Sequence, residues 1–184
     1  MHARAHYSMY PMNKTPQADA AETPADAPAP WPDKGPRLRV RQSGVHGRGV
    51  YALRPIRAGE TVIEYKGELI SWKQAQRRHP HDPSNPQHTF FFHIDDKHVI
   101  DGKHHGNAAR WINHSCEPNC ESETEGSRVF VKALRNIYPG EELFYDYGLV
   151  IDERMTPSLK REYACHCGSA NCRGTMLAPK RRKS

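Results

Sequence analysis

The hydrophobic residues of this chain fall into short runs that are separated by Gly, Pro, Asn and Asp. Five of these runs are rich in the β-branched and aromatic residues that favour strands: VYAL (50–53), TVIEYKGELI (61–70), TFFFHI (89–94), RVFVKAL (128–134) and EELFYDY (141–147). Short runs of this kind, bounded by turn residues, predict a protein built from several small sheets.

Helical signals are confined to three short segments: SWKQAQRRH (71–79), which Pro80 ends, GNAARWIN (106–113) and PSLKREYA (157–164). The sequence HDPSNPQ that follows Pro80 predicts a loop. Two other segments, IRAGETV (56–62) and IYPGEEL (137–143), predict β-turns in which Gly supplies a positive φ. We therefore expect a mainly β fold with short helices.

The 184 residues allow one domain of ordinary size with appendages. Between residues 15 and 32, eleven of eighteen positions are Ala or Pro, so there is almost nothing to bury, and we expect residues 1–37 to be a disordered tail. The chain has no apolar run long enough to span a membrane, and its first residues lack the apolar core of a signal peptide. We expect a soluble protein that is not exported by that route.

The formal net charge of +6 is concentrated at one end of the chain. Four of the positive charges lie among the last five residues, and positive and negative charges balance over residues 1–37. The folded body is therefore not expected to form a nucleic-acid-binding surface. The basic tail, residues 178–184, can be a nuclear localisation signal, a nucleic-acid contact or a solvated terminus, and its composition does not choose among these.

The five cysteines are more consistent with reduced, metal-bound or reactive thiols than with disulfides. In CHCGSANC (165–172), three thiols lie within eight residues and could approach one centre, but a closed zinc site needs a fourth ligand. The octapeptide NHSCEPNC (113–120) offers Cys116 or Cys120, and His114 and His166 are the candidates without a thiol. The alternative is that these cysteines are reduced core residues.

Five motifs, in this order, resemble those of SET-domain protein lysine methyltransferases with a post-SET zinc loop, of the trithorax and mixed-lineage-leukaemia type: HGRGVYA (46–52), IEYKGELI (63–70), GNAARWINHSCEPNC (106–120), GEELFYDYG (140–148) and CHCGSANCRG (165–174). The resemblance covers about residues 38–175. It implies a SET domain over 38–150 and a zinc-binding post-SET segment over 151–177. It also implies a β-clip-like fold with a pseudoknot, in which the segment carrying Tyr147 threads beneath a loop near Asn113 and His114.

The resemblance assigns roles to individual residues. S-adenosylmethionine, the methyl donor, is expected to contact His46, Gly47, Arg48, Gly49, Phe90, Asn113, His114 and Tyr147. Structural zinc is expected to bind Cys116, Cys165, Cys167 and Cys172. Catalysis is expected from Tyr147, which orients the reacting groups, and from Tyr145 and Tyr65 in the lysine channel. Phe90 replaces a tyrosine that is frequent in relatives, and Trp111 replaces a phenylalanine.

In the implied reaction a neutral lysine ε-amine attacks the methyl group of a sulfonium. The adjacent positive charge and desolvation both disfavour the ammonium form, so no strong base is required. A tyrosine at position 145 favours monomethylation, with dimethylation also open.

Two other classes of function compete with this one. A catalytically silent SET module that binds peptide or nucleic acid would be marked by loss of Tyr147 or of the Asn113–His114 pair, and both are present. A zinc-stabilised nucleic-acid-binding protein would need basic and aromatic residues spread over a folded surface. We expect a monomer whose partner is a lysine-bearing protein: a histone, a histone-like protein or another protein. It would act in the cytoplasm if bacterial, and at the nucleus or chromosome if eukaryotic or delivered into a host.

Overall fold

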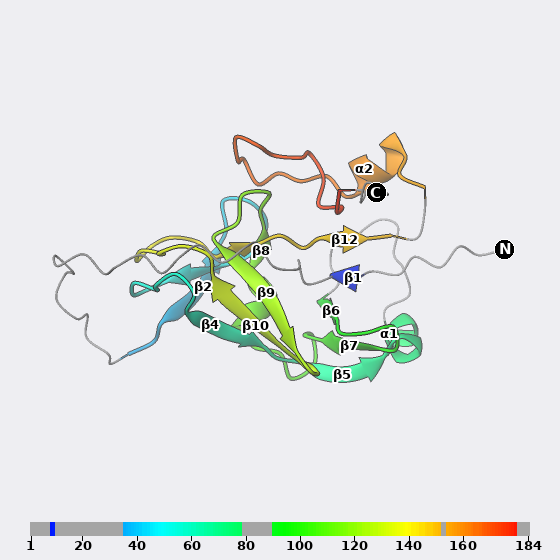
Figure 1. The fold of residues 1–184 in the computed structure, drawn as a ribbon, viewed down its shortest axis with the longest axis horizontal. Helices are drawn as coiled ribbons and strands as arrows, with labels where there is room; N and C mark the ends of the chain where they lie inside the picture. Colours follow the sequence, from blue (N-terminus) through cyan, green and yellow to red (C-terminus); the bar gives the residue numbers. More distant parts are fainter. Residues whose placement is uncertain (1–7, 10–34, 79–89, 152–153, 180–184) are drawn as a thin grey trace.

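The computed structural model describes residues 8–9, 35–78, 90–151 and 154–179, with residues 8–9 described by their backbone (Figure 1). The elements, in chain order, are β1 (Ser8–Met9), β2 (Leu38–Gln42), β3 (Arg48–Ala52), β4 (Thr61–Tyr65), β5 (Glu68–Ser71), α1 (Trp72–Arg78), β6 (Phe91–His93), β7 (His98–Asp101), the 3₁₀ helix η1 (Ala108–Trp111), β8 (Asn113–His114), β9 (Cys120–Glu125), β10 (Arg128–Ala133), β11 (Phe144–Tyr145), β12 (Leu149–Val150) and α2 (Pro157–Glu162). The prediction of a mainly β fold with short helices is confirmed.

The largest sheet carries much of the core. It has the order β4-β10-β9, and both pairings are antiparallel. Along the middle strand, Val129, Val131 and Ala133 are buried and alternate with more exposed residues, as expected for a strand with one face on the core. The polar strand β9, which follows Asn119, was not predicted from its sequence CESETE. Pairing with β10 along its whole length holds it extended.

A second sheet, with the order β5-β7-β6, lies beside the first, and α1 contacts its strands β5 and β7 (Figure 1). Helix α1 begins at Trp72 and ends at Arg78, as the sequence predicted, and Ala75 is its buried residue. The run at 61–70 is divided into β4 and β5 by Lys66 and Gly67. The loop predicted after Pro80 lies outside the described residues.

Two smaller pairings bring distant parts of the chain together. Strands β2 and β3 form an antiparallel ribbon. Strands β8 and β11 pair in parallel, with Asn113 opposite Phe144 and His114 opposite Tyr145. The two predicted turns are confirmed, because Gly59 and Gly140 both have a positive φ. These two segments also contact each other through an antiparallel bridge between Ile56 and Ile137.

The C-terminal segment packs against β12, the strand that begins two residues after Tyr147. Leu177, which is buried, forms a parallel bridge with Leu149 of β12, and Thr156 caps the N-terminus of α2 by accepting a hydrogen bond from the backbone of Leu159. The other two predicted helices are thus present as η1 and α2. In the part of the chain that the structure describes, no helix has the length and apolarity needed to cross a membrane.

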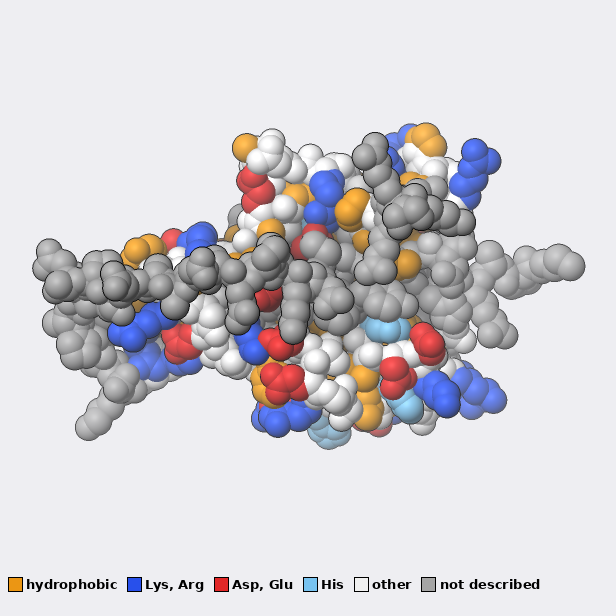
Figure 2. Space-filling model, viewed as in Figure 1, with side chains coloured by type: hydrophobic (Ala, Val, Ile, Leu, Met, Phe, Trp, Pro, Cys, Tyr) orange, Lys and Arg blue, Asp and Glu red, His pale blue; other side chains and the backbone are white. Residues whose placement is uncertain are grey.

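The N-terminal segment differs from its prediction at two points. Residues 1–37 were expected to be disordered, but Ser8–Met9 form β1, which pairs with β12, and the Arg37 carbonyl accepts the N–H of Leu53 at 2.8 Å. Residues 1–7 and 10–34 lie outside the described residues, as does the basic run 180–184. On the face shown in Figure 2, the acidic and basic side chains of the described residues are interspersed, in agreement with a folded body that carries little net charge.

Candidate functional site

Three tyrosines lie close together at the junction of the sheets. Tyr65 ends β4 and Tyr145 ends β11, and each is 2% exposed. The ring of Phe92 lies between them, with centroid distances of 5.3 Å to Tyr65 and 6.3 Å to Tyr145. The ring of Tyr147 follows at 5.1 Å from Tyr145. The structure therefore brings together the three residues to which the sequence assigned catalysis.

These phenols are kept neutral by their surroundings. Burial raises the pKa of all three tyrosines well above its usual value, and the effect is reinforced by Glu142 at Tyr147 and by the neighbouring tyrosines at Tyr65 and Tyr145. The Tyr65 hydroxyl donates to the Phe90 carbonyl at 2.8 Å, and the Tyr147 hydroxyl donates to the Ile112 carbonyl at 2.9 Å. Neutral, fixed hydroxyls suit the orientation of a substrate better than proton abstraction.

Asn113 holds the glycine-rich turn against the sheet. Its amide nitrogen donates to the carbonyls of His46 and Arg48 at 3.2 and 2.9 Å, and to Oε1 of Glu142 at 3.0 Å. The Glu142 carboxylate in turn accepts a hydrogen bond from the hydroxyl of Tyr51 at 2.6 Å. Asn113 thus connects two segments that the sequence placed together only by resemblance.

The two glycines of HGRG have separate reasons to be glycine. Gly47 has a φ of 50°, which is unfavourable for other residues. At Gly49 a Cβ would collide with the carboxylate of Glu142. The sequence predicted that these glycines let the backbone approach a cofactor. The structure supplies an additional reason at Gly49, which is the approach of Glu142 to Asn113.

The imidazole of His114 is buried between the tyrosine segment and the cysteines. Its Nδ1 accepts the backbone N–H of Tyr147 at 3.1 Å, so Nε2 carries the proton of the neutral ring. Nε2 lies 3.4 Å from Sγ of Cys116. Burial lowers the pKa of His114 to about 4 against the opposing effect of Asp146, and Arg173 lowers it further, so the ring is neutral at pH 7.

An open cleft lies beside this group, lined by Val45, His46, Asn113, His114, Tyr147, Ala164, Cys165, His166, Cys167 and Met176. Four residues predicted to contact the cofactor are among the lining. Gly47, Arg48 and Gly49 belong to the turn that Asn113 holds. The ring of Phe90 packs edge-on against Trp111, at a centroid distance of 5.0 Å, and its carbonyl accepts the Tyr65 hydroxyl, so Phe90 lies beside Tyr65 and outside the lining of the cleft.

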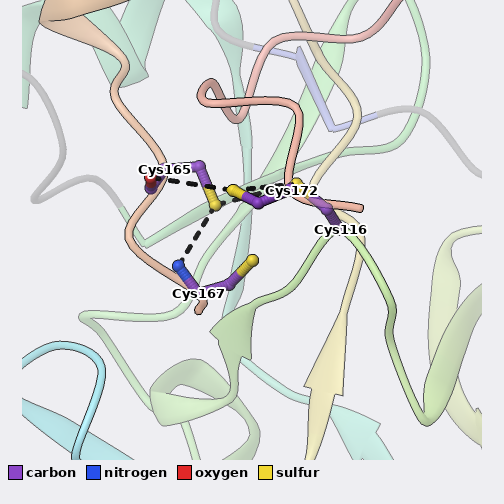
Figure 3. Close-up of side chains that lie close together, drawn as sticks. All are labelled: Cys116, Cys165, Cys167 and Cys172. Atoms are coloured by element: carbon purple, nitrogen blue, oxygen red, sulfur yellow. Dashed lines mark hydrogen bonds between the residues drawn. The ribbon is translucent and has the colours of Figure 1, made fainter. Parts of the chain in front are cut away.

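The four cysteines Cys116, Cys165, Cys167 and Cys172 form a compact cluster (Figure 3). Their sulfurs lie within 4.8 Å of one another. Cys116, from the segment after β8, is 3.7 Å from Cys165 and 4.0 Å from Cys172, measured between sulfurs. Four thiolates around one zinc, at about 2.3 Å each, would be separated by about 3.8 Å. The sulfur positions therefore fit a tetrahedral metal site.

Backbone donors point at these sulfurs. The N–H groups of Cys167, Arg173 and Gly174 approach Cys165, Cys116 and Cys172, with nitrogen–sulfur distances of 3.3 to 3.4 Å. Such donors stabilise thiolates, the form that binds a metal. Cys120 is different, because it is fully buried in the core and burial raises its pKa to about 12. Among the described residues, His166 lines the cleft and does not belong to the cluster.

Several residues that shape the site were missed by sequence reasoning: Val45, Ala164 and Met176 in the lining, Glu142 beside Asn113, and the pair Asp146 and Arg173. Their identities carry no periodic or metal-ligand signal. Glu142, Asp146 and Arg173 lie within the recognised motifs GEEL, FYDY and CRG, and the other three residues lie beside recognised motifs. This position is the one signal that could have found them.

The small sheets, the tyrosine group and the pairing of β8 with β11 define a SET-domain protein. The SET domain family matches residues 47–148, more than half of the chain, and the chain belongs to this family. This match confirms the SET-domain part of the resemblance that the motifs indicated.

The chain is similar in sequence to proteins that are named as histone-lysine methyltransferases. Over 138 residues, 73% of the chain, it is 44% identical to histone-lysine N-methyltransferase trithorax of Drosophila virilis and 42% identical to histone-lysine N-methyltransferase 2B of Homo sapiens. Over 147 residues, 76% of the chain, it is 40% identical to histone-lysine N-methyltransferase ATX2 of Arabidopsis thaliana. The matched regions are 3%, 5% and 13% of these relatives, so the chain corresponds to a small part of each.

Proposed function

We propose that this chain is a protein-lysine N-methyltransferase that uses S-adenosylmethionine. The observation that carries the proposal is the group of Tyr65, Tyr145 and Tyr147, buried and neutral, beside a cleft lined by Asn113 and His114. The names of the similar proteins support the same reaction.

The cleft is the proposed site of S-adenosylmethionine, which when bound supplies a methyl group activated by a sulfonium. His46, Asn113, His114 and Tyr147 would hold it, and Asn113 keeps the glycine-rich turn in place. The buried tyrosines line a low-dielectric passage in which a lysine amine is favoured in its neutral form. Their hydroxyls orient that amine, and no carboxylate base is assigned to the reaction.

We further propose that the four-cysteine cluster holds one structural zinc ion. The sulfur spacing and the backbone donors support this assignment. Cys165 and Cys167 also line the cleft, so the metal would stabilise one of its walls. In this proposal, residues 151–177 are the post-SET segment.

The proposed substrate is a histone or another protein with an accessible lysine, because the similar proteins are named for histone lysines. We also propose that the protein acts on chromatin as a monomer. Tyr145 favours a mono- or dimethylated product, since its hydroxyl occupies space beside the reacting amine.

The test is methyl transfer from labelled S-adenosylmethionine to two separate pools, core histones and a bacterial lysate. Transfer to a lysine in either pool by the native chain, and its loss in Tyr147→Phe, is the expected result. If the chain binds S-adenosylmethionine and peptide but transfers no methyl group to either pool, the catalytically silent module is the better interpretation.

A further inference from the structure

The N-terminal strand β1 lies between two strands that belong to different sheets. Ser8 pairs with Val150 and Met9 with Leu149, so β1 is antiparallel to β12. On its other side β1 lies beside β6, one of the two outer strands of the sheet β5-β7-β6 (Figure 1). A single extended segment thus lies between the edges of β12 and β6, and we call the position that it occupies the slot.

Each of the two strands beside this slot is connected to the tyrosine group, β12 along the chain and β6 through packing. Strand β12 begins at Leu149, two residues after Tyr147. Strand β6 follows Phe90, whose carbonyl accepts the Tyr65 hydroxyl, and contains Phe92, which packs against Tyr65 and Tyr145. A segment in the slot therefore lies between two strands that are connected to the tyrosine group.

The edge of β12 that faces β1 is available to one partner at a time. Leu149 directs its N–H and C=O to the C-terminal segment, where they pair with Met176 and Ala178 at 3.3 and 2.8 Å. Successive residues of a strand direct these groups to opposite sides, so Val150 directs its own toward β1. Such pairing recognises backbone and tolerates many sequences, which makes the slot suitable for any extended peptide.

We propose that the N-terminal segment carrying β1 competes with the protein substrate for this slot. This inference rests on the proposed methyltransferase function, because a peptide that delivers a lysine to the tyrosines has to lie beside them. Ser8 and Met9 carry no amine, so β1 occupies the slot without supplying a nucleophile. The segment is therefore an intramolecular inhibitor that the substrate displaces.

The balance between the two occupants depends on the covalent connection. A strand of two residues pairs weakly, but a segment of the same chain has an effective concentration that reaches the mM range. A substrate then binds with an apparent affinity reduced by the fraction of molecules whose slot is free. This predicts a large effect on KM and little effect on kcat.

The test compares the full chain with Ser8→Pro, which removes the N–H that pairs with Val150 and disfavours a paired strand. Ala20→Pro, outside β1, is the matched control. With core histones as substrate, Ser8→Pro is expected to lower KM by roughly fivefold at constant kcat, and the control to leave KM unchanged. A synthetic peptide of residues 1–14 should raise the KM of Ser8→Pro again, in competition with histone and not with S-adenosylmethionine.

Amide exchange at Val150, measured without either substrate, tests the pairing independently of activity. The Val150 amide should exchange faster in Ser8→Pro than in the native chain and the control. Equal exchange in all three would overturn the pairing, and faster exchange with an unchanged KM would overturn the competition. If no variant transfers methyl groups although exchange differs, the proposed function fails and the competition fails with it, while the pairing stands.

Discussion

The guanidinium group of Arg173 donates two hydrogen bonds to the carboxylate of Asp146, at 2.7 and 2.8 Å. Asp146 lies between Tyr145 and Tyr147, and Arg173 directly follows Cys172. The backbone N–H of Arg173 also points at the sulfur of Cys116, at 3.3 Å. One residue therefore connects the cysteine cluster to the segment that carries two of the tyrosines.

Removal of this connection should disturb the tyrosines as well as the fold. Arg173→Ala leaves the Asp146 carboxylate, which is 8% exposed, without its cation, and we expect it to lower the free energy of unfolding by roughly 2 kcal/mol. A displaced Tyr147 should also slow methyl transfer by roughly 10- to 100-fold at a temperature where the variant is folded. Denaturant unfolding and single-turnover kinetics measure the two effects.

Arg128 offers a matched control for this prediction. It forms a similar two-bonded pair with Glu64, at 2.8 and 2.9 Å, but its side chain is 61% exposed. Arg128→Ala should lower the free energy of unfolding far less than Arg173→Ala does, because solvent screens an exposed ion pair. Equal losses of stability and of transfer rate in the two variants would contradict the role assigned to Arg173.

The second prediction concerns the metal. Purified protein should contain one zinc per chain, and Cys167→Ser or a chelator should remove both the zinc and the binding of S-adenosylmethionine, because Cys165 and Cys167 line the cleft. Cys120→Ala, a change in the core, should keep the zinc. Metal analysis and calorimetry decide the matter, and zinc that is lost from Cys120→Ala but kept by Cys116→Ala would show that the ligand set is wrong.

The third prediction concerns the cleft. Asn113→Ala breaks three hydrogen bonds that hold the glycine-rich turn, and His114→Ala removes the acceptor of the Tyr147 N–H. Each variant should weaken S-adenosylmethionine binding at least about tenfold in calorimetry, since each lost contact is worth roughly 1 kcal/mol or more. Asn136→Ala, which breaks a hydrogen bond in the turn at Ala58, is the control and should bind normally. Unchanged affinity in both site variants would remove the cofactor assignment.

The fourth prediction separates two tyrosines. Tyr147→Phe should reduce the rate of the first methyl transfer by at least ~100-fold, because a positioning hydroxyl is lost. Tyr145→Phe should keep the first transfer and shift the product toward di- and trimethyl-lysine, because it creates room beside the amine. Mass spectrometry of a methylated peptide reads both results, and the opposite pattern would mean that the roles are exchanged.

The fifth prediction follows from the contact between Gly49 and Glu142. Gly49→Ala would displace the Glu142 carboxylate from the Asn113 amide and should weaken S-adenosylmethionine binding by roughly fivefold, as expected for loss of one hydrogen bond to a charged group. Gly44→Ala has open space around its Cβ and should bind like the native chain. In a Glu142→Ala background, where this hydrogen bond is already absent, Gly49→Ala should leave the affinity nearly unchanged. If it does not, the loss comes from another cause.

Much of the local structure could be predicted because it depends on neighbouring residues. The apolar run at 128–134 predicts a strand, and β10 forms there. The helix at 71–79 and the turns at Gly59 and Gly140 were also found as predicted. Strand β9 could not be predicted, since CESETE has the composition of a loop and becomes a strand through its pairing with β10.

Within the candidate site, residues with a distinctive chemical type could be recognised from the sequence, but the contacts between them could not. The spacing of Cys165, Cys167 and Cys172 indicated a metal centre but left the fourth ligand open. The structure distinguishes Cys116 from Cys120 by the direction of the chain, because Cys120 begins β9 and its side chain enters the core, while Cys116 faces the C-terminal segment. That choice depends on packing between segments that are far apart in the sequence.

The sequence by itself determined the short strands, the turns, the tyrosines and thiols, and membership of the SET-domain family, since side-chain chemistry and local backbone preference act within a few residues. Tertiary structure decided that Glu142 faces Gly49, that Arg173 binds Asp146 and that β1 lies between β12 and β6. Each of these contacts joins residues at least 27 positions apart, as in the pair of Asp146 and Arg173. Long-range contacts of this kind form when the sheets pack and bring their edges together, and no local preference specifies them.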